Sequence, residues 1–122
     1  MKKLLLFFSL ILVFSCKDKT VSSTLEVCGV KDPVRNLPWL KAKIDSSKSK
    51  KAAEMLTITL AKIKGETVFN YSTVYMSCIG CVAFHCDGTR LDPKKYTPQE
   101  MQDYMNTILG DGTRGPVIWP EK

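Results

Sequence analysis

The sequence contains one histidine, His85, among its 122 residues. Histidine is the side chain whose unperturbed pKa suits general acid–base catalysis near neutral pH, so the chain offers a single obvious group for that role. No serine or cysteine nucleophile with an acidic partner can be paired with His85 from the sequence. A lone histidine in a strand-like segment is typical of a structural residue, and we therefore predict no catalytic residue and no enzyme activity.

Motifs that bind cofactors are also missing. A covalently attached haem needs C-x-x-C-H, and Val82 occupies the histidine position after the Cys78-Ile79-Gly80-Cys81 run. The glycines from residue 110 onward follow a predicted helix instead of opening one, so no phosphate-binding glycine loop is indicated. Cys78, Cys81, His85 and Cys86 together offer the ligand types of a structural zinc site. A strand over 81–86 points Cys86 away from Cys81 and His85, and we predict no metal and no cofactor.

No apolar run approaches the ~20 residues that a helix needs to cross a membrane. The longest run, Leu4 to Phe14, has eleven residues and follows a cationic Met1-Lys2-Lys3 start. This pattern predicts a signal peptide over residues 1–15. Its end, Val13-Phe14-Ser15-Cys16, resembles the bacterial lipobox, which implies diacylglycerol on the Cys16 thiol, cleavage before Cys16 and acylation of the new amino end. An ordinary secretory signal with a chance cysteine is the alternative.

The remaining chain is predicted to be a short polar tether, residues 16–25 including Cys16, followed by one globular domain over residues 26–122. Removing Lys2 and Lys3 from the 18 basic residues leaves 16 against 12 acidic residues, a net charge of +4. Most of the excess is carried by Lys17, Lys19, Lys41, Lys43, Lys48, Lys50 and Lys51. Such a patch can bind acidic lipid, glycan or nucleic acid, but a solvated face is more typical. An exported protein rarely meets nucleic acid, and we predict none as a partner.

Four cysteines remain once Cys16 carries lipid, and they are Cys28, Cys78, Cys81 and Cys86. An even number of thiols in a small exported domain predicts two disulfides, with three pairings possible. Position favours Cys28 with Cys86, because that bond ties the start of the domain to the sheet. Cys78 and Cys81 then close a tight loop.

The Cys78-x-x-Cys81 spacing also permits a second interpretation. It forms a redox-active dithiol in proteins where it opens a helix, because the helix terminus lowers the pKa of the first thiol. Strand-like residues flank the motif on both sides here, and nothing helical follows Cys81. We therefore predict a structural disulfide, with a thiol–disulfide oxidoreductase as the alternative.

Hydrophobic periodicity predicts the elements of the domain. A helix begins near Asn36, which can cap it, with Pro38 in the first turn. Leu56, Ile58 and Leu60 then alternate with smaller residues, which indicates a strand with one buried face. A Lys64-Gly65 turn leads to a second strand rich in β-branched and aromatic residues at 67–76, and its Phe69, Tyr71 and Tyr75 are expected in the core. Asp87-Gly88, between strands at 82–86 and 89–91, predicts a type I′ turn with positive φ at both residues.

The clearest element is a helix after Thr97. Thr97 and Glu100 have the spacing of a capping box, Pro98 stands at the first helical position, and Gly110 is a natural stop. Val117 to Trp119, between two prolines, can add only a short edge strand. The prediction is an α+β fold: a small antiparallel sheet of about four strands, with an N-terminal and a C-terminal helix packed on one face.

Three segments carry a family resemblance. Cys28-Gly-Val-Lys-Asp-Pro33, Asn36-Leu-Pro-Trp-Leu40 and Phe84-His-Cys-Asp-Gly88 resemble a group of small lipoproteins of the Bacteroidetes type, over residues 28–91. The resemblance implies a lipid-anchored domain of the cell envelope and brings no established activity with it.

These observations predict a lipid-anchored binding or interaction module without catalysis. Its location is the bacterial outer membrane, facing the periplasm or the cell surface, and acyl chains on Cys16 attach it to the membrane. The expected ligand is an envelope protein or a glycan. Inhibition of a protease or lysozyme is one concrete version, by analogy with other small exported α+β domains.

Overall fold

The structure is a computed structural model that describes residues 25–110 and 115–121. The described residues form two small antiparallel sheets with three α-helices and two short 3-10 turns, which confirms the predicted α+β class. The elements in chain order are β1 (Glu26–Val27), β2 (Val30–Lys31), α1 (Pro33–Asn36), α2 (Pro38–Ser49), η2 (Ala53–Met55), β3 (Leu56–Ile63), β4 (Glu66–Thr73), β5 (Ala83–Phe84), η3 (Pro93–Lys95), α3 (Pro98–Leu109) and β6 (Val117–Trp119).

The main sheet has the strand order β5-β4-β3-β6, and all of its pairings are antiparallel. β3 and β4 pair along their full length, from Leu56 opposite Thr73 to Ile63 opposite Glu66. The turn between them has positive φ at both Lys64 (53°) and Gly65 (77°), the geometry of a type I′ hairpin. The predicted hairpin at this position is therefore confirmed.

The predicted strand at 89–91 is wrong. That segment makes only an isolated bridge between Phe84 and Arg90, and the fourth strand of the sheet is β6. The predicted type I′ turn at Asp87-Gly88 is also wrong, because only Gly88 of the two residues has positive φ. Gly88 N–H donates to the carbonyl of His85, so the turn spans 85–88 and ends on the glycine.

Asp87 stabilises this different turn through its own side chain. Its Oδ1 accepts hydrogen bonds from the backbone N–H (2.9 Å) and the hydroxyl (2.6 Å) of Thr89. The hydroxyl bond and then the backbone bond lower the pKa of Asp87. Gly88 has a second reason to be glycine, because a Cβ atom there would lie 2.7 Å from the Trp39 ring.

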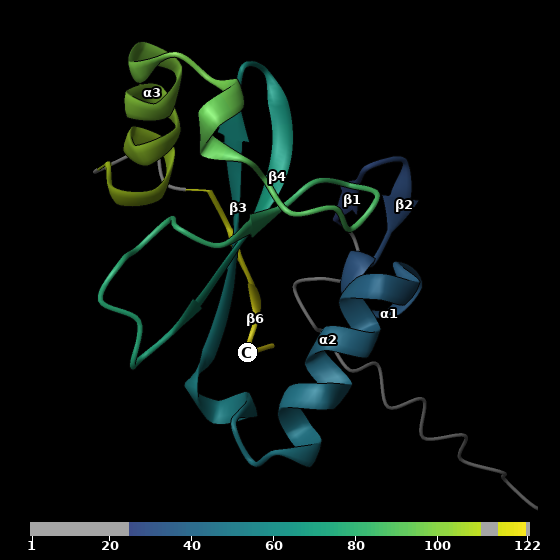
Figure 1. The fold of residues 1–122 in the computed structure, drawn as a ribbon. Coiled ribbons are helices and arrows are strands. Elements are labelled where there is room, and N and C mark those ends of the chain that lie inside the picture. Colours follow the sequence, from purple (N-terminus) through teal and green to yellow (C-terminus); the bar gives the residue numbers. More distant parts are fainter. Residues whose placement is uncertain (1–24, 111–114, 122) are drawn as a thin grey trace, which may run out of the picture.

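The two long helices pack on opposite faces of the sheet, not on one face as predicted (Figure 1). Side chains of α2 join Leu56, Ile58 and Leu60 in one core, whereas side chains of α3 join Ala61 and Ile63 in another. The physical reason is that β3 has apolar residues on both faces, since successive side chains alternate across a strand. A strand with two buried faces needs a cover on each side.

The ends of the helices follow the sequence to different degrees. α3 has the full predicted capping box: Thr97 Oγ1 accepts from Glu100 N–H (3.2 Å), and Glu100 Oε2 accepts from Thr97 N–H (2.9 Å). α2 starts at Pro38, one residue later than a cap at Asn36 predicts, and Leu37 takes the cap position without a side-chain hydrogen bond. Asn36 ends the separate α1 turn, and its side chain donates to the carbonyl of Lys31 (2.7 Å).

The structure joins Cys28 to Cys86 and Cys78 to Cys81, with Cα–Cα separations of 5.7 and 5.6 Å. These are the two pairs that chain position favours. The first bond connects the β1–β2 ribbon to the turn after β5, across 58 residues of sequence. The second bond joins two cysteines that are three positions apart in the sequence.

We predict that removing the long-range disulfide destabilises the protein more than removing the short one. In the chain-entropy model the Cys28–Cys86 closure stabilises by about 4 kcal/mol and the Cys78–Cys81 closure by about 2 kcal/mol. Urea unfolding of Cys28→Ser/Cys86→Ser and of Cys78→Ser/Cys81→Ser measures both effects. Equal losses, or peptide mapping that links Cys28 to Cys78 or Cys81, contradict this prediction.

Candidate functional site

The structure joins four of the cysteines singled out in the sequence as two separate disulfides and does not gather them with His85 into one site. Cys16 lies outside the described residues, as do the predicted signal peptide and most of the tether. Cys86, Cys78 and Cys81 belong to disulfides, and His85 Nδ1 lies 2.9 Å from Glu66 Oε1 at the surface. Over the ranges 25–110 and 115–121, no group of three or more His, Cys, Asp or Glu side chains is arranged to hold a metal ion.

The feature that stands out instead is the loop over residues 74–82, between β4 and β5. Figure 1 shows it as the long excursion on the left of the sheet. Val74 is 75% exposed, Tyr75 67% and Ile79 47%. Met55 is also exposed, and it contacts this loop because the Tyr75 hydroxyl meets its Sδ. Apolar side chains gathered on one exposed segment mark a site of interaction more than scattered ones do.

Three contacts hold the second half of this loop, residues 78–81. The Cys78–Cys81 disulfide closes these four residues into a ring, and Gly80 within the ring is buried with φ at 85°. The carbonyl of Gly80 accepts a hydrogen bond from the hydroxyl of Tyr104, which is fully buried on α3 (3.1 Å). A Cβ atom at position 80 would lie 2.8 Å from Met105 Sδ, so the backbone rests directly on α3. Ile79 is therefore exposed on a segment whose neighbours are fixed.

Tyr104 is suited to this role because burial keeps it neutral. Desolvation raises the pKa of Tyr104 to about 12, since the interior disfavours the charged phenolate. A tyrosine keeps its proton at physiological pH even at its ordinary pKa, and the raised pKa keeps the Tyr104 hydroxyl a hydrogen-bond donor into the alkaline range as well. The loop and α3 are coupled through this one donor.

The Cys78–Cys81 pair has one property that suits redox chemistry and one that does not. Both residues are exposed, so a small or protein thiol can reach the disulfide. Neither residue begins a helix, because the segment from 74 to 82 contains only turns and bends. The helix terminus that lowers thiol pKa values in dithiol enzymes is thus missing at this pair.

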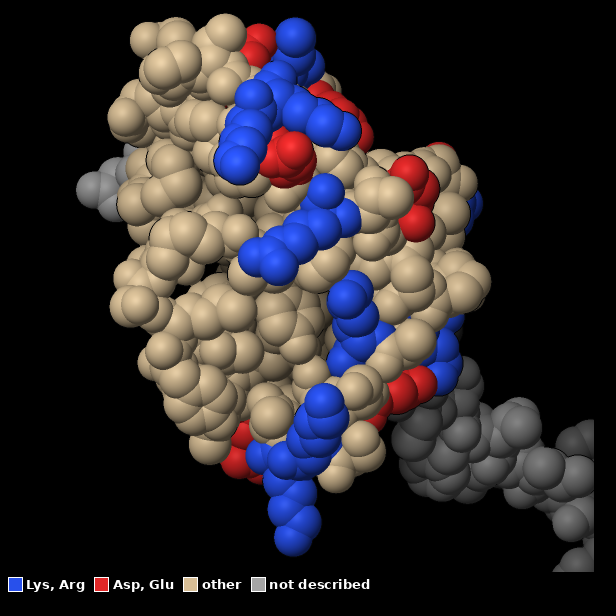
Figure 2. Space-filling model, in the orientation of Figure 1, with Lys and Arg blue, Asp and Glu red and all other residues tan. Residues whose placement is uncertain are grey.

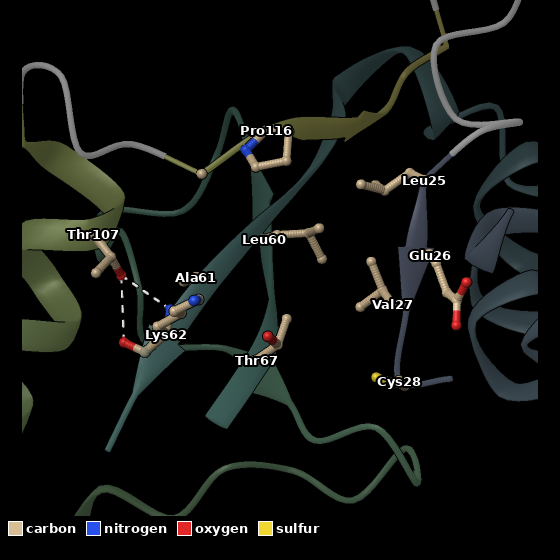
Figure 3. A pocket seen from close by; sticks show the side chains of 11 residues that line it. Leu25, Glu26, Val27, Cys28, Leu60, Ala61, Lys62, Thr67, Thr107 and Pro116 are labelled. Atoms are coloured by element: carbon tan, nitrogen blue, oxygen red, sulfur yellow. Dashed lines mark hydrogen bonds between the residues drawn. The ribbon is translucent and has the colours of Figure 1, made fainter. Parts of the chain in front are cut away.

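Figure 3 shows a second feature, a cavity of about 370 Å³ between β1 and the sheet. Its walls are largely apolar and include Leu25, Val27 and Leu60. At one side of the cavity, Thr107 Oγ1 accepts a hydrogen bond from the backbone N–H of Lys62 (3.1 Å). Lys62 lies on β3 beyond the residues that pair with β6, so the Thr107 side chain takes the place of a strand partner there. Polar groups do not converge in this cavity, which we interpret as a gap between packed elements.

The exposed loop was not recognised in the sequence. Val74 to Met76 continue the β-branched and aromatic composition of β4, so they are predicted as strand and Tyr75 as core. The structure ends β4 at Thr73 and exposes Tyr75, although Phe69 is buried as predicted. Ser77 and Gly80 were available as signals of a break, but neither identifies which residues become exposed.

Comparison of the chain with protein-family models, with curated proteins and with solved structures finds no match. The resemblance to small envelope lipoproteins therefore stays a prediction. Among the described residues, no helix combines the length and the apolar character needed to cross a membrane.

We predict that Tyr104→Phe destabilises the protein by about 1 kcal/mol at neutral pH, the value of a buried hydrogen bond. The pH dependence tests the burial of the Tyr104 hydroxyl separately from its hydrogen bond. Because the folded pKa is raised above the usual 10, the stability from neutral Tyr104 is fully present below pH 10 and is lost as pH rises through about 12. Unfolding measured from pH 8 to 12 should show a decline in the parent protein that is smaller in Tyr104→Phe. Parallel curves contradict the assignment.

Proposed function

We propose that this protein is a lipid-anchored binding module of the bacterial cell envelope, which contacts a partner protein through the loop at residues 74–82. The observation that carries the proposal is that this loop exposes Val74, Tyr75 and Ile79, while its segment 78–81, which holds Ile79, is fixed by a disulfide and by Tyr104. Exposing apolar side chains costs free energy that a partner can recover by covering them.

The fixed segment favours binding for an entropic reason. A flexible loop must lose conformational freedom when it binds, whereas a loop closed before binding has already lost most of it. Tyr and Ile side chains on such a loop supply the large apolar contacts that dominate small protein interfaces. Inhibition of an envelope or extracellular hydrolase, such as a protease or lysozyme, is the concrete form that we favour.

The anchor rests on the sequence. Val13-Phe14-Ser15-Cys16 resembles a lipobox, and two disulfides in a small domain suit an oxidising compartment. The nine residues from 17 to 25, fully extended at ~3.5 Å each, reach about 30 Å. A domain on such a tether stays close to the membrane surface. Its partners are then proteins on the periplasmic or the external side of the outer membrane.

A thiol–disulfide oxidoreductase is the second candidate, and the exposure of Cys78 and Cys81 is the observation that favours it. In that reaction a substrate dithiol is oxidised to a disulfide while the Cys78–Cys81 bond is reduced to two thiols. Rapid exchange with glutathione, together with a low pKa of the Cys78 thiol after reduction, would promote this candidate over the binding module.

For the anchor, we predict that Cys16→Ala abolishes lipidation and processing. Each acyl chain contributes about 0.8 kcal/mol per buried methylene, so two or three chains hold the parent protein in the membrane fraction. Intact-mass analysis of detergent-extracted protein is the measurement. A parent chain that starts elsewhere than Cys16, or that lacks acyl mass, shows that the anchor is wrong.

For the loop, we predict that a photo-crosslinker at Ile79 captures a discrete partner in intact cells, and that a crosslinker at Leu109 does not. Leu109 is a matched control because it is 48% exposed against 47% for Ile79. Tyr75→Ser should reduce the Ile79 adduct about tenfold, the loss expected when a central aromatic contact is removed. No adduct at Ile79, or equal adducts at both positions, contradicts the loop as the binding surface.

A further inference from the structure

An open groove of about 620 Å³ lies between α2, Tyr71 on β4 and Gly88 in the turn after β5, on the face opposite α3. Tyr71 and Trp39 supply its aromatic part, and Lys43, Ser46, Ser47 and Lys50 supply its α2 wall. β5 has only two residues, so the sheet ends early and leaves these rings partly exposed. The groove therefore exists because β5 is too short, and the facing side chains of α2 too small, to fill the space between them.

The aromatic rings are fixed in position. The Trp39 Nε1–H donates to the carbonyl of Cys86 (2.8 Å), and the Tyr71 hydroxyl shares a hydrogen bond with Ser47 Oγ (3.0 Å). Phe84 stands between them, with ring centroids 5.8 Å from Trp39 and 6.1 Å from Tyr71. A ligand that stacks on these rings meets a surface already arranged for it.

The lysines of the wall are placed to receive negative charge. Lys43 lies on α2 and Lys50 is the C-cap residue that follows it, seven positions later, about two helical turns or ~10 Å along the same side. Lys43 Nζ lies 4.2 Å from the Phe84 ring centroid. Within the described part of the chain neither lysine forms a salt bridge, whereas Lys41 on another side of α2 lies 2.6 Å from Asp45.

Figure 2 shows that Lys and Arg side chains gather along a line on one face, from η3 at the top to α2 at the bottom. A surface with this excess of positive charge attracts anions. The groove adds aromatic faces and the exposed Ser46 hydroxyl between its two lysines, whereas the Ser47 hydroxyl is buried and bonded to Tyr71. A linear acidic polysaccharide matches these groups, because its sugar rings have apolar faces for the aromatics, hydroxyls for Ser46 and acid groups for the lysines.

We propose that this groove, the α2 groove, binds an acidic polysaccharide along the Lys43–Lys50 side of α2. The site is separate from the loop at 74–82 and does not depend on a partner protein there. A flat anionic bilayer satisfies the lysines but leaves the concave aromatic floor unused, so we favour the polysaccharide. Screening by salt should weaken the interaction, because both lysines are partly in water.

The test uses the detergent-solubilised full chain carrying Trp119→Phe. The sequence has two tryptophans, so this variant keeps Trp39 as its single tryptophan and its fluorescence reports on the groove. We expect heparin to change the Trp39 fluorescence in a saturable, salt-sensitive way, and neutral dextran to leave it unchanged. Lys43→Gln/Lys50→Gln should weaken heparin binding about tenfold, equivalent to about 1.4 kcal/mol. The control Lys94→Gln/Lys95→Gln makes the same change in net charge on η3 and should weaken it less than about twofold, since distant exposed charges are screened.

Four outcomes overturn the proposal. Equal weakening by the two double variants shows a net-charge effect without a site. Equal binding of dextran shows that charge is not recognised. Tighter binding to phosphatidylglycerol vesicles than to phosphatidylcholine vesicles, lost in Lys43→Gln/Lys50→Gln and without binding to heparin, makes the patch a membrane contact. Lys43→Arg/Lys50→Arg keeps both charges and should keep binding, so its loss also counts against the proposal. The crosslinking experiment at Ile79 tests the loop at 74–82 independently, so none of these outcomes bears on the proposed function.

Discussion

Burial of the β3–β4 hairpin on both of its faces is the constraint on which the rest of the structure depends. Ile58 and Phe69 are fully buried toward α2, while Val68 is fully buried toward Tyr104 on α3. Full burial of each such side chain stabilises by about 1.5–3 kcal/mol. Neither core alone is large, so the small domain needs both, and each helix is required to cover its own face.

This two-sided arrangement gives the molecule two different surfaces. Beside α3, the chain that leaves β4 is fixed by Tyr104 and then exposes Ile79 on the disulfide loop. Beside α2, the short β5 leaves Trp39 and Tyr71 open toward the lysines of the helix. The Cys28–Cys86 bond connects the start of the domain to the turn that supports Trp39. The surfaces therefore share one scaffold but use separate residues.

Some signals confined to a few neighbouring residues predicted their elements well, although the Asp87-Gly88 turn and the Asn36 cap did not. The Thr97 capping box and Gly110 gave the limits of α3, because caps act on the backbone groups of one helix end. Position in the chain was also enough to favour the Cys28–Cys86 and Cys78–Cys81 pairs over the other combinations. The α+β class followed from the separate periods of the helical and strand segments.

Features that depend on what packs against a segment could not be predicted. Ala61 and Ile63 continue β3 onto a second buried face, and nothing local shows that α3 covers that face instead of joining α2. Tyr75 has strand-like neighbours, so its exposure depends on where the sheet ends. The α2 groove forms where small side chains of α2 face the short strand β5. No single segment of the sequence shows that these two elements lie opposite each other.

The central claim is that the loop at residues 74–82 is an ordered platform and not a flexible connection. Backbone ¹⁵N relaxation of the amides of Cys78, Ile79, Gly80 and Cys81 tests it most directly. The account predicts order parameters of about 0.85, equal to those of β4, as expected for a rigid backbone. Values below about 0.6 at these amides, with β4 remaining rigid, would contradict it.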